Sequence, residues 1–179
     1  MTFISAISRA AEPPHLWFGN TRVAIRIASA EGADGISVIE HWMPWGEAPP
    51  LHVHRNEDEI FHVLAGRMLF RVGGRTFEAG PGETVLAPKG VPHHFRVESP
   101  EGARCLTVTR GADFETMVRA VSSAAAGDGL PPQAVPDAET IGALTRACAA
   151  NGIDVIGAPS SARGPNGRGP RRRWYGPGR

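Results

Sequence analysis

The sequence predicts an all-β domain, an antiparallel sandwich or barrel, followed by two helices and a disordered tail. The first observation is spacing: between residues 21 and 109, short runs rich in Val, Ile, Phe and Leu are interrupted by Gly or Pro at close intervals, which is typical of antiparallel β proteins. The second is Gly73-Gly74, which suits a two-residue hairpin turn. The expected strands cover residues 21–29, 35–43, 51–54, 59–66, 67–72, 75–79, 84–88, 93–97 and 103–109.

Two helices are expected after the last strand. In residues 112–125, apolar side chains recur at helical spacing, and Asp113 is the expected N-cap. The stripe consists of Phe114, Met117, Val118 and Val121. The second helix covers residues 137–152, with Asp137 as the cap and an Asn-Gly stop at Gly152. We expect both helices to pack beside or across one end of the barrel.

The chain is divided into an N-terminal extension (1–20), a barrel (21–110), a helical segment (111–159) and a tail (160–179). The tail contains six arginines and no acid, so the rest has 13 basic and 18 acidic residues and a formal charge of −5. Its Arg, Gly and Pro cannot bury enough apolar surface to fold. It is either a plain disordered extension or a weak binder of nucleic acid or another anion. Nothing else in the sequence indicates a nucleic-acid reader.

Cysteine usage and hydropathy predict a cytoplasmic protein. Cys105 and Cys148 lie far apart and form no CxxC pair, so we expect two reduced, buried thiols rather than a disulfide. The first residues contain no run that resembles a secretory signal, and no stretch approaches the roughly 20 apolar residues of a membrane span. Lys89 is the only lysine among many arginines, alanines and glycines, which indicates a GC-rich bacterial genome.

Three histidines and one acid are predicted to converge. His52 and His54 are one residue apart in an extended segment, so their side chains point to the same face. Residues 55–58 form a polar hairpin tip, and Glu59 begins the returning strand beside the two imidazoles. Downstream, a tight Pro-Lys-Gly turn places His93 at the start of a new strand. Three imidazoles and one carboxylate are therefore expected at one point.

These residues belong to two motifs that resemble those of the cupin superfamily. The first, G-x5-H-x-H-x4-E-x6-G, is matched by Gly46, His52, His54, Glu59 and Gly66. The second, G-x5-P-x-G-x2-H-x3-N, is matched by Gly82, Pro88, Gly90 and His93, with Val97 in place of the final Asn. Because that Asn is not a metal ligand in the family, the departure concerns a local loop contact. The resemblance covers residues 23–109.

The resemblance implies a double-stranded β-helix, a jelly-roll barrel with its site in the mouth, and a homodimer. It also implies that His52, His54, Glu59 and His93 bind one divalent metal. Imidazoles and a carboxylate suit a first-row ion, and four protein ligands on an octahedral ion leave two positions for substrate and dioxygen or water. Iron, manganese, nickel, cobalt, copper and zinc all remain open. The alternative is a vacant site of hydrogen-bonded histidines.

The other acids and histidines receive simpler interpretations. Glu57 and Asp58 are expected to be solvated at the hairpin tip, although Glu57 would be the next candidate ligand if the strand register slipped. His94 and His62 should point away from the predicted site, because neighbours alternate along a strand. The remaining histidines, His41 and His15, are assigned to the surface or core.

The predicted pocket walls are apolar. Strand alternation places Phe61, Val63, Met68, Phe70 and Phe95 around the predicted site. Such a pocket suits a flat aromatic or polyketide-like molecule better than a small acid or a sugar phosphate. No tyrosine precedes Tyr175, which excludes a mechanism that needs a barrel tyrosine.

Among cupins, the LHVHxxEDE and PxGxPHxF segments look most similar to quercetin 2,3-dioxygenase-type monocupins. That resemblance implies that Glu59 deprotonates a flavonol hydroxyl and that dioxygen then opens the heterocycle with loss of carbon monoxide. Two alternatives remain: a metal-dependent cyclase or isomerase that needs no oxygen, and a small-molecule-binding cupin without turnover. Oxygen consumption separates the first function from the other two.

Overall fold

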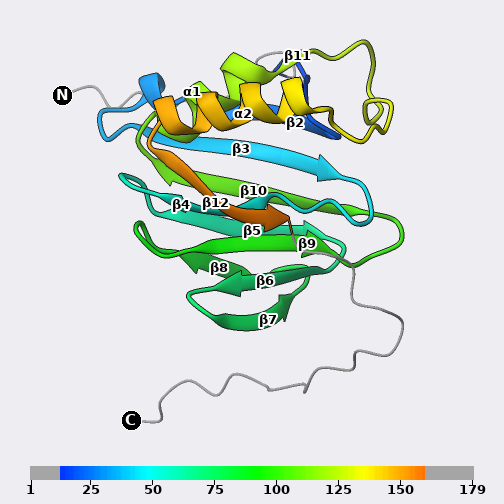
Figure 1. Ribbon diagram of the computed structural model, residues 1–179, viewed down its shortest axis with the longest axis horizontal. Coiled ribbons are helices and arrows are strands. Elements are labelled where there is room, and N and C mark those ends of the chain that lie inside the picture. Colours follow the sequence, from blue (N-terminus) through cyan, green and yellow to red (C-terminus); the bar gives the residue numbers. More distant parts are fainter. Residues whose placement is uncertain (1–12, 160–179) are drawn as a thin grey trace, which may run out of the picture.

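The computed structural model describes residues 13–159, which form two antiparallel sheets and two α-helices (Figure 1). The larger sheet contains β1 (Leu16–Phe18), β2 (Thr21–Ile27), β3 (Ile36–Met43), β5 (Glu59–Ala65), β8 (Thr84–Ala87), β10 (Ala103–Arg110) and β11 (Ser123–Ala124). The smaller sheet contains β4 (Pro50–His54), β6 (Met68–Val72), β7 (Arg75–Ala79), β9 (His93–Val97) and β12 (Ile153–Pro159). The strand order is β11-β1-β2-β3-β10-β5-β8 in one sheet and β12-β4-β9-β6-β7 in the other. This is a jelly-roll barrel, as the sequence predicts.

All nine expected strands are present, and their bounds differ from the prediction by at most two residues. The Gly73-Gly74 pair forms the predicted turn between β6 and β7, with φ of +56° and +83°. Three further strands, β1, β11 and β12, were not predicted. The predicted tail and residues 1–12 of the predicted N-terminal extension lie outside the described residues.

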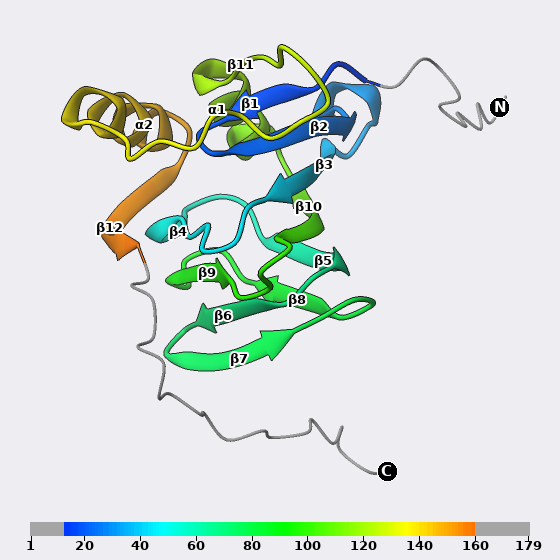
Figure 2. The same cartoon turned by 90° about the vertical axis from the view of Figure 1, so that its right-hand side faces the viewer.

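The helices lie on one side of the barrel: α1 packs against β2 and β3 of the larger sheet, and α2 packs on α1 and on β12 of the smaller sheet (Figure 2). They are α1 (Asp113–Val121) and α2 (Ala138–Ala150), preceded in the chain by a single 3-10 turn, Ser29–Glu31. The predicted cap of α2 is confirmed, because the Asp137 carboxylate accepts a hydrogen bond from the Thr140 N–H at 2.8 Å. No helix within residues 13–159 is long and apolar enough to cross a membrane.

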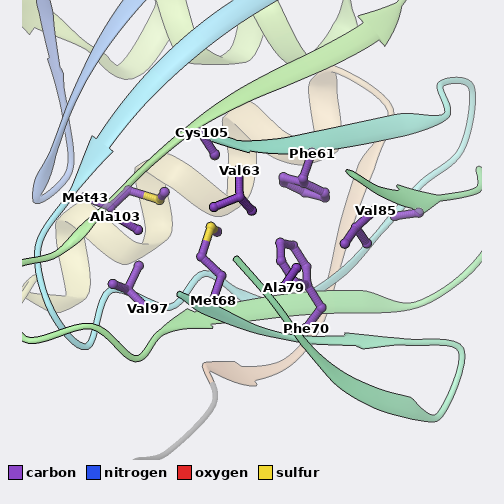
Figure 3. Packing of buried hydrophobic residues seen from close by; sticks show 11 residues of the cluster. Met43, Phe61, Val63, Met68, Phe70, Ala79, Val85, Val97, Ala103 and Cys105 are labelled. Atoms are coloured by element: carbon purple, nitrogen blue, oxygen red, sulfur yellow. The ribbon is translucent and has the colours of Figure 1, made fainter. Parts of the chain in front are cut away.

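The apolar interior has two parts. The first, which we call the barrel core, lies between the two sheets and includes Phe61, Val63, Met68 and Phe70, whose side chains point toward one another (Figure 3). The second, the helix-side core, contains Val23, Ile39, Phe114, Met117, Val118, Cys148 and Ile153. Burial of this much apolar surface is the main force that closes the barrel and holds the helices against it.

Candidate metal centre

The four predicted ligands meet at one place inside the barrel. His52 and His54 are on β4, Glu59 is the first residue of β5, and His93 is the first residue of β9. The β4 and β9 strands pair with His52 opposite His93. One potential ligand atom from each residue lies within 4.8 Å of all the others. Period-two alternation on β4 and a hairpin that returns the chain at Glu59 are what bring them together.

One carboxylate oxygen is central to the cluster. Glu59 Oε2 lies 2.9 Å from His93 Nε2, 3.4 Å from His54 Nε2 and 3.9 Å from His52 Nε2. Glu59, His54 and His93 are buried, and the side chain of His52 is 11% exposed. His52 is therefore the most exposed member of the cluster.

Backbone carbonyls orient two of the imidazoles. His52 Nδ1 is 2.8 Å from the Pro50 carbonyl oxygen and His93 Nδ1 is 3.0 Å from that of Val91. Because a carbonyl can only accept, these contacts assign a proton to Nδ1 and direct Nε2 of each ring toward Glu59, with a hydrogen bond between His93 Nε2 and Glu59 Oε2 at 2.9 Å. Both ring nitrogens of His54 are buried without a hydrogen-bond partner within residues 13–159. A carboxylate that faces three imidazole nitrogens needs positive charge beside it, either from protons on the imidazoles or from a bound cation, so the cluster can hold a metal ion.

The electrostatics of the cluster are consistent with that interpretation. Although burial acts to raise the pKa of Glu59, the imidazoles of His54, His52 and His93 outweigh it and hold this pKa well below the usual range. For His54, burial acts to lower the pKa, but the carboxylates of Glu59 and Glu57 raise it. The site therefore favours a carboxylate with positive charge beside it, which a bound cation supplies.

A cavity of about 90 Å³ adjoins the cluster, several times the roughly 10–15 Å³ that one water needs. Its barrel wall comprises His41, Met43, His52, His54, Glu59, Phe61, Phe95, Cys105 and Thr107. Its C-terminal wall comprises Phe114, Met117, Leu144, Cys148, Ile153 and Val155 from α1, α2 and β12. Phe18, Thr21, Glu47, Pro49 and Pro50 complete the lining. The pocket therefore lies where the barrel core meets the helix-side core.

The structure divides the predicted pocket residues into two groups. Phe61 and Phe95 line the pocket, whereas Val63, Met68 and Phe70 pack in the barrel core beneath it. The four predicted ligands lie near one end of the barrel interior. Inward-facing residues further along the strands therefore contact each other instead of the cavity. Alternation gives the face of a strand but not the depth of a residue in the barrel.

Glu57 corrects a prediction. It is 2% exposed, not solvated, and its carboxylate accepts hydrogen bonds from the backbone N–H groups of Asp113 at 2.8 Å and Phe114 at 3.0 Å. It thus caps α1 from the hairpin tip, and Asp113, the predicted N-cap, is the first residue of the helix. Asp58 is exposed as expected and accepts a hydrogen bond from the Lys89 N–H at 2.9 Å.

The remaining histidines lie in different places. His62 is outside the cluster and its Nδ1 is 2.9 Å from Thr84 Oγ1. His94 follows His93 on β9 and does not belong to the cluster. His15 packs edge-on against Trp42. His41, however, lines the pocket, is 6% exposed and packs against Phe114 with ring centroids 6.1 Å apart.

Sequence reasoning missed His41 and Glu47 as pocket residues. A signal for His41 was present, because it alternates with the apolar Ile39 and Met43 and so had to point inward with them. Burial lowers the pKa of His41 to about 4, against the opposing influence of Glu59 and Glu40, so this imidazole is neutral at pH 7. Glu47 lies in a loop, where no periodicity indicates direction.

Comparison with known proteins identifies a domain and a fold. Residues 39–109, from β3 to β10, match the cupin domain family and include the whole cluster. A 57-residue segment is 35% identical to an uncharacterised protein from Methanocaldococcus jannaschii and covers 32% of this chain and 46% of that protein. The chain thus spans less than half the length of that relative.

The chain was also compared with solved structures. A predicted oxalate decarboxylase from Thermotoga maritima superposes with a TM-score of 0.54 over 59% of this chain and 98% of that chain, at 18% identity, which shows a common fold. The polyketide cyclase RemF from Streptomyces resistomycificus is 30% identical over 56% of this chain and 69% of that chain, with a TM-score of 0.45.

Proposed function

We propose that this protein, whose barrel has the cupin fold, is a metal-dependent dioxygenase that opens the ring of an apolar aromatic enol such as a flavonol. The observation that carries the proposal is the position of the cluster: three imidazole nitrogens and one carboxylate oxygen lie within 4.8 Å of one another beside a pocket with mostly apolar walls. Few polar groups and one metal centre are typical of sites that bind flat, hydrophobic substrates.

The donor set fits a divalent first-row transition metal held by His52, His54, Glu59 and His93. Bound there, such an ion would supply a Lewis acid and, if it is redox-active, a partner for dioxygen. The chain's own contribution is to fix the ligands, and the Pro50 and Val91 carbonyls do so by orienting the rings of His52 and His93.

The walls select for the substrate. Phe61 and Phe95 pack edge to face with ring centroids 5.6 Å apart and offer an aromatic surface beside the cluster. From the other side, Phe114 and Leu144 exclude water. The lining contributed by residues 13–159 includes no lysine or arginine. Apart from the proposed ion, a sugar phosphate or small dicarboxylate would find no cationic side chain here, whereas a neutral aromatic ring would be well matched by the apolar walls.

A non-redox cyclase or isomerase is the second candidate. The specific observation in its favour is that the pocket lining within residues 13–159 includes His41 and Glu47, which lie outside the ligand set and can exchange protons. Enolisation and ring closure need proton transfers but no oxidant. The same pocket and the same metal would serve either reaction.

The experiment that tests the proposal measures oxygen uptake, which separates a dioxygenase from a cyclase or isomerase. Protein freed of metal is reconstituted separately with iron, manganese, nickel, cobalt, copper and zinc and mixed with quercetin, while the flavonol absorption band and dissolved oxygen are followed together. We expect at least one redox-active metal to support coupled loss of flavonol and oxygen, and the His93→Ala protein to support none. Flavonol loss without oxygen uptake would favour the second candidate. Binding without any turnover, with several flavonols, would contradict both enzymatic functions and favour a binding protein.

A further inference from the structure

Within residues 13–159, the pocket lining contains one carboxyl group that is not a predicted metal ligand, on Glu47. The other titratable side chains of the lining that lie outside the cluster are His41 and two cysteines. Burial raises the pKa of Cys105 to about 12, and burial also raises that of Cys148, so both thiols stay protonated at neutral pH. The neutral imidazole of His41 can donate or accept a hydrogen bond, but Glu47 is the group that can hold a negative charge.

The backbone of Glu47 is held rigidly beside the ligand strand β9. The Val97 N–H donates to the Glu47 carbonyl at 2.9 Å, and the Gly46 N–H donates to the Val97 carbonyl at 3.0 Å. The Glu47 N–H closes a turn onto the Pro44 carbonyl at 3.2 Å. Val97, at the position of the missing motif Asn, thus fixes this loop through its main chain. The same strand carries His93 and Phe95, so the loop with Glu47 and the ligand His93 are both attached to β9.

The side chain of Glu47 differs from the other buried or half-buried acids of residues 13–159 in its lack of a hydrogen-bond or ion-pair partner. Seven other acidic side chains are buried or half-buried, and each has a hydrogen-bond or ion-pair partner: Glu40, Glu57, Glu59, Glu98, Asp113, Glu115 and Asp154. Glu47 is half-buried and has no such partner within this part of the chain. A partly desolvated carboxyl without a partner is costly, and burial accordingly raises its pKa. No hydrogen bond or ion pair within residues 13–159 accounts for an acid at this position.

We propose that Glu47 is the catalytic acid–base residue of the pocket, which accepts the hydroxyl proton of the aromatic enol and returns it to the product. The inference rests on the proposed function. In the first step the substrate O–H bond breaks, the proton forms a bond to a Glu47 carboxylate oxygen, and the electron pair stays on the substrate oxygen. Glu59, which the sequence resemblance suggests as the base, has its Oε2 directed at three imidazoles, so it holds the ion while Glu47 moves the proton.

The test compares Glu47→Gln and Glu47→Asp with wild-type protein and with Glu101→Gln, which changes an exposed acid. All four are loaded with the metal that supports quercetin turnover, and metal content, melting temperature and kcat/KM are measured between pH 5 and 8. We expect Glu47→Gln to keep its metal and melting temperature but to lose about 100-fold in kcat/KM, together with the acidic limb of the pH profile. Glu47→Asp should recover part of the rate and the limb, and Glu101→Gln should match wild type.

Each alternative result has a defined meaning. A Gln variant with wild-type turnover and an unchanged pH profile overturns the role of Glu47 and leaves the proposed function intact. A Gln variant that loses its metal or melts at a lower temperature in step with its rate shows a structural role and also overturns the inference. If wild-type protein turns over no flavonol with any metal, the proposed function fails, and the role of Glu47 toward an enol fails with it.

Discussion

The barrel wall and the C-terminal wall of the pocket differ in chemistry and in how they are built. The barrel wall carries the charged cluster, on strands that belong to the matched domain. The C-terminal wall consists of apolar side chains from α1, α2 and β12, and it lies outside that domain. One wall can bind an ion, and the other excludes water and shapes the cavity. The charged wall and the apolar wall of the pocket thus come from different regions of the chain.

The two regions are joined at the hairpin tip between His54 and Glu59. Arg55 forms an ion pair with Asp154 of β12 and donates to the Ala149 carbonyl of α2 at 2.9 Å. Asn56 donates to Asp113 at 2.8 Å, and Glu57 caps α1. Every residue from Arg55 to Glu57 therefore contacts the C-terminal segment. The helices hold in place the turn that brings Glu59 back to the histidines.

The largest expected effect is the loss of metal affinity when a ligand of the barrel wall is removed, which tests whether metal binding depends on that wall alone. His93→Ala removes a ligand, so metal affinity should fall by more than about 100-fold, as measured by metal analysis after dialysis against a weak chelator. The neighbouring His94→Ala and, on the opposite wall, Leu144→Ala should keep the wild-type metal content. Retention of metal by His93→Ala with loss by His94→Ala would mean that the β9 register is wrong.

The barrel was predictable because each strand carries its own signal. Alternation along β4 and β5 and a glycine turn between β6 and β7 are local features, and the ligand positions follow from them. β12 has only a weak alternating pattern, Ile153 and Val155, and it pairs with β4 from about a hundred residues away. Its position depends on the helix-side core, which local sequence does not specify.

The environment of the Glu57 side chain likewise could not be predicted from the local sequence. A charged residue between two strands is usually solvated, and nothing nearby in the sequence indicates otherwise. Its partners, the N–H groups of Asp113 and Phe114, are 56 and 57 residues away. His41 was the opposite case: its inward direction was predictable, but its position at a pocket was not, because the C-terminal wall that closes the pocket was not predicted.

The second prediction concerns the contact between the two regions at Glu57. Glu57→Ala leaves two backbone N–H groups of α1 without their acceptor in a buried place, which should cost about 2 kcal/mol of unfolding free energy. The melting temperature of metal-free protein should fall by roughly 4–8 °C. Glu57→Gln keeps one acceptor oxygen and should lose less. Equal stability of the Ala variant and wild type would show that the hairpin tip does not support α1.

A smaller loss of unfolding free energy is expected from a substitution at the junction of α2 and β12. Gly152 has φ +71°, and a Cβ there would meet the side chains of Asp113 and Asn56. Gly152→Ala should therefore cost about 1–2 kcal/mol, measured by urea denaturation. Gly127→Ala is the matched control, since it has open space around it and no positive φ, and it should be neutral or slightly stabilising. Equal effects at both glycines would contradict the close packing of this junction on the hairpin tip.

The smallest expected effect is a pH-dependent change in stability at Glu115, which links α1 to the 3-10 turn at Ser29–Glu31. Glu115 on α1 accepts hydrogen bonds from the Ser29 N–H at 2.7 Å and from Arg119 Nε at 2.9 Å. Burial acts to raise its pKa, but these two partners outweigh burial and lower it below the usual 4.5. Because the folded-state pKa is the lower one, the stabilisation is fully present above pH 4.5 and is lost as the pH falls through the folded value.

Glu115→Gln should therefore be about 1 kcal/mol less stable than wild type at pH 7, with the difference shrinking below pH 4.5, in urea titrations of metal-free protein. The metal ligands are unchanged in this variant, so its metal affinity at pH 7 should equal that of wild type. A stability difference that stayed constant down to pH 3 would mean that the carboxylate charge of Glu115 contributes nothing, and that α1 is held by its apolar face alone.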